Sequence, residues 1–309
     1  MSAISEPILR FLDVGDPAAK TGQPRRMAWW DWPVQDGGDP SHIVVCVHGL
    51  SRQGRDFDAL ASLLSRHARV VSVDVAGRGE SDWLADPMGY QVETYARDMA
   101  LLLTHLRQQV PGAVIDWVGT SMGGLIGIAV ASQAALAPRK LVLNDVGPVV
   151  QWSSLQRIGA YVGTNRSFGV EQEAFDYMAS ISEGFGPHTP DEWARLSRPM
   201  LRQRDGRWWF HYDPAIGTPI KALLAQPEDV ALAVTRQGEE KLWSLYDAIS
   251  SETLLLRGAE SDLLAPETAM EMARRGPKAR CVEFAGVGHA PTLVADDQKK
   301  VVLDFLCGS

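Results

Sequence analysis

The stretch AVIDWVGTSMGGLIG, residues 113–127, decides the fold. Residues 114–118 form an apolar run typical of a short buried strand, and small and apolar residues from Leu125 onward predict a helix. The five residues centred on Ser121 match the pattern G-x-S-x-G. A serine between a strand and a helix predicts a strained turn that lifts its hydroxyl clear of the sheet. The N–H of Met122, at the helix start, would then face a developing negative oxygen and form one half of an oxyanion hole.

Strands and helices alternate on both sides of this stretch. Apolar runs at 42–47, 69–75, 140–146, 253–257 and 280–284 predict further strands, with helical patterns between most of them and after the last. Two runs at 8–14 and 26–32 predict an antiparallel pair at a sheet edge. The alternation predicts an α/β fold with a mostly parallel sheet covered on both faces. It breaks at 148–235, which predicts an inserted helical cap on a core formed by 1–147 and 236–309.

Composition excludes several classes of function. The 309 residues carry a formal net charge of −8, which argues against nucleic acid or an anionic membrane surface as a partner. No apolar stretch is long enough to span a bilayer, and the N-terminus lacks the pattern of a secretory signal. The three cysteines show no paired spacing, and Cys46 and Cys281 lie in strand-like runs that predict burial. These features favour a cytoplasmic protein.

A serine hydroxyl needs a base and an acid that orients the base. His289 in the stretch GVGHAP follows the last predicted strand and is the candidate base. Asp262 in the stretch GAESDL follows the preceding strand and is the favoured acid. Asp145 and Glu260 remain alternatives, because each also follows a strand, and Asp262 could instead cap the next helix.

A second oxyanion donor and a pocket are also expected. The N–H of Leu50, directly after the predicted strand and the pair His48-Gly49, is the candidate donor, whereas His48 itself is expected to be structural. Arg52 and Arg55 could contact a polar substrate group or could be solvated surface residues. Aromatic residues of the insertion are expected to line a pocket for a small-molecule substrate; the candidates are Trp152, Trp208 and Trp209. The sequence shows no ligand cluster for a metal and no need for a cofactor.

These motifs together resemble the α/β-hydrolase superfamily. The matching stretches are HGL (48–50), DVAGRGES (74–81), GTSMGG (119–124), GAESDLL (258–264) and GVGHAP (286–291). The resemblance implies an eight-stranded, mostly parallel sheet with a helical lid. It implies Ser121 as nucleophile, His289 as base and Asp262 as acid, with the amides of Leu50 and Met122 as the oxyanion hole.

The resemblance favours a carboxylic-ester, thioester or lactone hydrolase. Haloalkane dehalogenases and epoxide hydrolases of this fold use an aspartate nucleophile, and a serine stands at that position here. C–C hydrolases of the meta-cleavage type remain an alternative, although the run Leu50-Ser51-Arg52-Gln53-Gly54 departs from their S/G-x-G-P-G pattern. A small-molecule receptor that retains the triad without turnover is the alternative outside enzymology.

Overall fold

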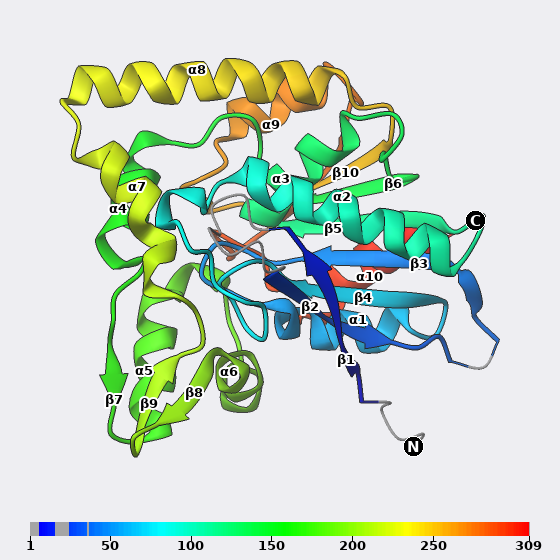
Figure 1. The fold of residues 1–309 in the computed structure, drawn as a ribbon. Helices are drawn as coiled ribbons and strands as arrows, with labels where there is room; N and C mark the ends of the chain where they lie inside the picture. Colours follow the sequence, from blue (N-terminus) through cyan, green and yellow to red (C-terminus); the bar gives the residue numbers. More distant parts are fainter. Residues whose placement is uncertain (1–5, 16–24, 36, 309) are drawn as a thin grey trace.

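A computed structural model describes residues 6–15, 25–35 and 37–308, so residues 1–5 of the stretch examined for a secretory signal lie outside it. Its centre is an eight-stranded sheet in the order β1-β2-β4-β3-β5-β6-β10-β11 (Figure 1). The six strands from β4 to β11 are parallel, and the edge strands β1 and β2 run antiparallel to their neighbours. This architecture confirms the predicted mostly parallel sheet with its antiparallel edge pair.

The strands and helices of the core have the following bounds. The strands are β1 (Ile8–Val14), β2 (Arg25–Trp32), β3 (Asp39–Val47), β4 (Ala68–Asp74), β5 (Val114–Thr120), β6 (Lys140–Asn144), β10 (Glu252–Gly258) and β11 (Arg280–Phe284). The helices are α1 (Asp58–Leu64), α2 (Val92–Gln109), α3 (Met122–Ala131), α8 (Glu228–Asp247), α9 (Pro266–Met272) and α10 (Asp296–Cys307).

Helices cover both faces of the sheet, so the central strands are apolar on both sides. In β3, Val45 and Val47 face one cluster of buried residues, to which α2, α3, α8 and α9 contribute. Val44 and Cys46 face a second cluster, to which α1 and α10 contribute. This two-sided burial is the physical reason why these strands read as continuous apolar runs rather than as alternating ones.

The insertion lies between β6 and β10, beside the core in Figure 1. It contains α4 (Trp152–Tyr161), α5 (Glu171–Ile181), α6 (Pro190–Ser197) and α7 (Thr218–Leu224). It also contains a three-stranded sheet in the order β7-β9-β8, formed by β7 (Ser167–Phe168), β8 (Leu201–Arg204) and β9 (Arg207–Phe210). The insertion is therefore not purely helical, because the hairpin from β8 to β9 pairs its own short strands around Asp205-Gly206.

Two expectations differ from the structure. The predicted boundary at 235/236 falls inside α8, a continuous 20-residue helix that begins at Glu228 and packs against α3. Cys46 is buried as expected, but Cys281 is exposed because β11 is the edge strand of the sheet. In the described part of the chain, none of the cysteines forms a disulfide.

Two features are absent from the described residues. No helix in these ranges has the length and apolar character needed to cross a bilayer. Within the same ranges, no group of three or more His, Cys, Asp or Glu side chains is arranged to hold a metal ion.

Candidate active site

Ser121 lies at the sharp turn between β5 and α3. Its backbone has φ 51° and ψ −117°, a strained conformation with positive φ that residues other than glycine rarely adopt. The turn is closely packed: a Cβ added to Gly123 would lie 2.0 Å from the carbonyl oxygen of Val47. A Cβ added to Gly119 would lie 2.3 Å from the oxygen of Gly123. These contacts explain why glycines flank the serine on both sides.

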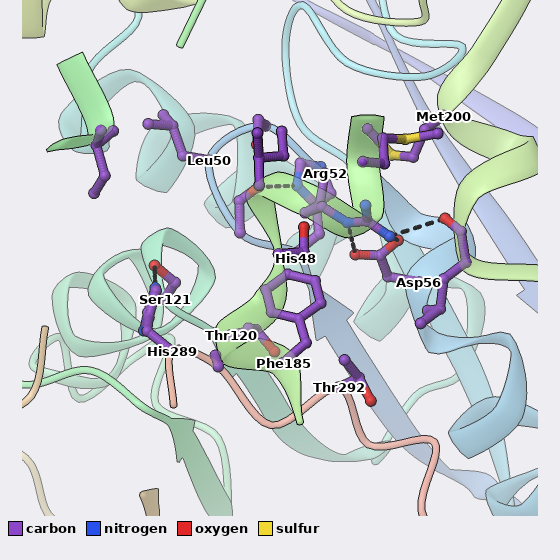
Figure 2. A pocket seen from close by; sticks show the side chains of 18 of the residues that line it. His48, Leu50, Arg52, Asp56, Thr120, Ser121, Phe185, Met200, His289 and Thr292 are labelled. Carbon is purple, nitrogen blue, oxygen red and sulfur yellow. Dashed lines mark hydrogen bonds and ion pairs between the residues drawn. The ribbon is translucent and has the colours of Figure 1, made fainter. Parts of the chain in front are cut away.

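The structure brings His289 against Ser121. The Nε2 atom of His289 lies 3.0 Å from the Ser121 hydroxyl oxygen, at a distance suited to a hydrogen bond (Figure 2). His289 reaches this position from the loop between β11 and α10, at the carboxyl end of the sheet. The two residues are 168 positions apart in the chain, and the sequence-based pairing of their side chains agrees with this geometry.

The acid that contacts the histidine is Asp145. Its Oδ2 atom lies 2.7 Å from Nδ1 of His289, and its side chain is wholly buried. Asp145 directly follows β6 and has a positive φ of 55°, which aspartate tolerates better than most residues. Its carboxylate also accepts hydrogen bonds from the N–H of Gly258 at 2.9 Å and from the hydroxyl of Ser261 at 2.6 Å. Three donors therefore hold the carboxylate in place beside the imidazole.

Asp262, the favoured acid in the sequence analysis, does not contact His289. Its carboxylate forms two hydrogen bonds with the guanidinium of Arg157, at 2.8 and 3.0 Å, and its side chain is 51% exposed. Its backbone carbonyl accepts a hydrogen bond from Ser154, so this loop is tied to α4 of the insertion. The assignment of Asp262 as the orienting acid is corrected to Asp145. The end of β10 and the loop after it support Asp145, through Gly258 and Ser261 respectively, instead of supplying the acid.

The loop after β3 lies beside Ser121. A Cβ built on Gly49 would lie 3.7 Å from the Cβ of Ser121, so the adjacent amide of Leu50 is close to the serine. The carbonyl of Gly49 accepts hydrogen bonds from Nδ1 of His48 at 2.7 Å and from the N–H of Arg52 at 3.1 Å. Because the Gly49 carbonyl and the Leu50 N–H belong to one planar peptide, these bonds also orient the Leu50 N–H.

His48 is held as a neutral imidazole. Its Nδ1 must carry the proton, since it donates to a carbonyl, and its Nε2 accepts from the N–H of Val75 at 3.1 Å. Burial, together with the positive charges of Arg78 and Arg52, lowers the pKa of His48 to about 3, although the hydrogen bond to Gly49 opposes this shift. The expectation of a structural role in the loop fits these contacts.

A pocket opens above Ser121 and His289, between the carboxyl ends of the strands and the insertion (Figure 2). Its walls combine aromatic rings with aliphatic side chains and a few polar groups. The aromatic rings are Phe57, Tyr161, Tyr177, Phe185, Phe210 and Tyr212. The aliphatic part consists of Leu50, Ile158, Met178, Ile181, Leu196 and Met200. Such a lining suits a small, partly apolar molecule that carries some polar atoms.

The tryptophans expected at this pocket lie elsewhere. Trp208 and Trp209 are paired within the small sheet of the insertion, where Trp208 packs against the apolar core and Trp209 lies under Arg204. Trp152 begins α4. None of the three is among the described residues that line the pocket, so their assignment as substrate-binding residues is corrected. Phe210 and Tyr212, which do line the pocket, follow Trp208 at intervals of two residues, the period of a strand. This spacing could have identified them, whereas the number of aromatic residues could not.

The two candidate arginines differ. Arg52 lies on the pocket wall, but its guanidinium is paired with Asp56 at 2.6 and 2.7 Å and donates to the carbonyl of Leu196 at 2.9 Å (Figure 2). It therefore joins the core to the insertion and has few donors left for a ligand. Arg55 pairs with Asp58 instead and does not belong to the described pocket lining.

Comparisons with known proteins agree with this fold. Residues 44–304 match the alpha/beta hydrolase family. The chain is 42% identical over 311 residues to the 3-hydroxybutyrate-oligomer hydrolase of Cupriavidus necator, with 99% of each chain covered. It is 26% identical over 277 residues to esterase Rv0045c of Mycobacterium tuberculosis, covering 88% of this chain and 83% of the relative.

Solved structures give the same result. The crystal structure of an alpha/beta hydrolase from Novosphingobium aromaticivorans superimposes with a TM-score of 0.80 at 30% identity, covering 99% of this chain and 100% of the other. A family match over most of the chain, a relative at 42% identity and the shared fold lead to one conclusion. The chain belongs to the alpha/beta hydrolase family.

Proposed function

We propose that this chain is a serine hydrolase that cleaves carboxylic esters through an acyl-enzyme intermediate. The observation that carries the proposal is the hydrogen-bonded series from Ser121 through His289 to Asp145 at the floor of the pocket. A nucleophile, a base and a buried acid in this order are what acyl transfer requires. The relatives named as an esterase and as an oligomer hydrolase support ester bonds as the target.

In the first half of the reaction, the Ser121 oxygen attacks the ester carbonyl carbon while Nε2 of His289 takes the hydroxyl proton. The carbonyl oxygen becomes an oxyanion and accepts hydrogen bonds from the N–H groups of Leu50 and Met122. The tetrahedral intermediate then collapses and expels the alcohol, to which His289 returns the proton. Asp145 stays ionised and stabilises the imidazolium through Nδ1.

In the second half, a water molecule replaces the alcohol. His289 takes a proton from this water as its oxygen attacks the acyl carbon bound to Ser121. A second oxyanion forms in the same place and collapses, which releases the carboxylic acid and returns the proton to the Ser121 oxygen. Loss of one oxyanion donor would raise the barrier by about 3 kcal/mol.

For the substrate, we propose a short ester of a small hydroxy acid. The relative from Cupriavidus necator is named for 3-hydroxybutyrate oligomers, which combine short apolar segments with an ester at each link. The pocket suits this chemistry because its lining combines the phenol side chains of Tyr161, Tyr177 and Tyr212 with apolar side chains.

The test is a steady-state assay on a p-nitrophenyl butyrate standard and on linear 3-hydroxybutyrate dimers and trimers. Ser121→Ala should lower kcat by about 10⁵-fold or more and should abolish covalent labelling by a phosphonofluoridate. Ser132→Ala is the matched control, because Ser132 is the C-cap of the same helix and its hydroxyl donates to the carbonyl of Ala129. Turnover by Ser121→Ala at the rate of the unmodified protein would refute the mechanism. Turnover of the standard without turnover of the oligomers would refute the substrate.

A further inference from the structure

Arg78 is a buried charge that has no anionic partner among the described residues. It lies in the loop that follows β4, and its exposed fraction is 0%. Among the described residues, no carboxylate oxygen lies within 4.0 Å of its guanidinium nitrogens, whereas Arg25 and Arg257, the other buried arginines, are each paired with an acid. The guanidinium of an arginine carries a positive charge and has donors but no acceptor.

The partners of Arg78 are all neutral groups. Nε donates to the carbonyl of Leu50 at 2.9 Å, and Nη1 donates to the carbonyl of Ala76 and to the hydroxyl of Tyr95, each at 2.7 Å. Nη2 lies 3.6 Å from the sulfur of Met122. Burying an isolated cation costs several kcal/mol even after the protein relaxes around it. Neutral acceptors recover only part of that cost, so the positive charge is retained at the expense of stability.

The contacts of Arg78 coincide with the two residues whose amides form the proposed oxyanion hole. Its guanidinium touches Leu50 through the carbonyl and Met122 through the side chain. Leu50 follows β3 and Met122 starts α3, so a single side chain bridges the two segments that must be held at a fixed separation. A preorganised hole depends on this separation, because its two N–H donors must converge on one oxygen.

The loop that carries Arg78 is itself fixed to the insertion. The N–H of Gly79 donates to the carbonyl of His211 at 3.0 Å, and the N–H of Asp213 donates to the carbonyl of Gly77 at 2.8 Å. Arg78 therefore forms an isolated β-bridge with Tyr212, which lines the pocket. The backbone of Arg78 is therefore fixed on both sides by hydrogen bonds to the insertion.

We propose that Arg78 is the positioning residue of the oxyanion hole, and that its unpaired charge stabilises the negative charge that develops there. It holds the Leu50 and Met122 segments together and supplies a positive potential directly behind them. In a water-excluded environment such a charge stabilises an oxyanion more strongly than it could in water. This inference rests on the proposed function, since an oxyanion forms only if Ser121 attacks a carbonyl.

The test compares Arg78→Met, which keeps an unbranched stem but removes the charged guanidinium, with Arg78→Lys. Two quantities are measured: kcat and KM for p-nitrophenyl butyrate, and the inhibition constant of butylboronic acid. This acid adds to a serine as an anionic tetrahedral adduct. For Arg78→Met we expect kcat to fall by about 30- to 100-fold and the boronate inhibition constant to rise by a similar factor, with KM within about twofold. Arg78→Lys should recover about a third of the loss on a logarithmic scale, because it keeps the charge but not the fork of donors.

Arg25→Met is the control, because Arg25 is an equally buried arginine on β2 whose partner is Asp98. It should lower the free energy of unfolding while leaving kcat and the boronate constant of the folded enzyme unchanged. If Arg78 has a purely structural role, Arg78→Met should behave like Arg25→Met: the free energy of unfolding falls, while kcat and the boronate inhibition constant stay unchanged. That result would overturn the inference. If Arg78→Met does not fold, Arg78→Lys provides the test. A kcat and a boronate inhibition constant of Arg78→Lys equal to those of the unmodified protein would overturn the inference.

Ser121→Ala separates this inference from the function on which it rests. Full activity in Ser121→Ala would refute the proposed function, and the Arg78 inference with it. An inactive Ser121→Ala beside a fully active Arg78→Met would refute the Arg78 inference alone.

Discussion

Replacing Asp145 by asparagine tests which carboxylate orients the histidine. In the native site the Asp145 carboxylate accepts from Nδ1 of His289 at 2.7 Å, so the proton of the neutral imidazole stays on Nδ1 and Nε2 is free to accept from Ser121. An asparagine can keep the bond from the N–H of Gly258 to its Oδ1, but its NH₂ group would face Nδ1 of the imidazole. The imidazole would then carry its proton on Nε2 and could not act as the base.

The expected loss in kcat for Asp145→Asn is about 10⁴-fold, equivalent to about 5 kcal/mol in the barrier. The assay is the release of p-nitrophenol from p-nitrophenyl butyrate, with the burst amplitude measured separately so that acylation can be distinguished from later steps. Because the carboxylate and the amide have nearly the same shape, the fold should be retained, and a denaturant titration should verify this.

Asp262→Asn is the matched control. The Asp262 side chain is 51% exposed and the Arg157 side chain 43%, and exposed ion pairs of this kind contribute about 1 kcal/mol or less. We therefore expect kcat of Asp262→Asn to stay within about fivefold of the unmodified protein. An equally large loss of kcat in Asp262→Asn, or an unchanged kcat in Asp145→Asn, would refute the assignment of Asp145.

Two further predictions concern stability. Gly123→Ala should lower the free energy of unfolding by about 3 kcal/mol, because its Cβ would lie 2.0 Å from the Val47 carbonyl oxygen. Gly238→Ala, in open space on α8, should raise the free energy of unfolding by about 0.5 to 1 kcal/mol. Equal denaturation midpoints for the two variants would contradict this account of the turn. Folding lowers the pKa of His48 to about 3, from about 6.5 in the unfolded chain. Between these two pH values only the unfolded chain binds a proton at His48. The contribution of His48 to the free energy of unfolding is therefore lost as the pH falls through that window. Between pH 7 and pH 5 this loss should be about 2 kcal/mol and should be absent in His48→Asn, as measured by denaturant unfolding at both pH values; the same loss in both proteins would refute it.

Much of the fold could be predicted because local chemistry and tertiary structure agree there. The parallel strands are buried on both faces, so their apolar runs are visible in the sequence without knowledge of any neighbour. The turn at Ser121 is visible for a similar reason, since the clash at Gly119 and Gly123 leaves only glycine at these positions. The structure of the insertion was harder to predict, because its short strands β7, β8 and β9 form a separate sheet in the described part of the chain and carry no long apolar run.

The acid at the site could not be chosen from the sequence. Asp145 and Asp262 each follow a strand, β6 or β10, and these strands are parallel neighbours whose carboxyl ends meet at the same edge. Order along the chain is therefore compatible with either residue. The positive φ of Asp145 and the partners of Asp262 on α4 settle which carboxylate faces the imidazole, and both arise from packing.

The sequence by itself determined the class of fold, the turn that carries Ser121 and the loop that carries His289, because a local pattern of apolar, glycine and polar residues predicts each of them. Only the tertiary structure decided which acid contacts His289, which aromatic rings line the pocket and which buried arginine lacks an anionic partner among the described residues. These are contacts between segments that lie far apart in the chain, such as the 144 positions between Asp145 and His289. Such contacts depend on the direction in which packing of the helices and strands orients each side chain, and a local sequence pattern does not predict that direction.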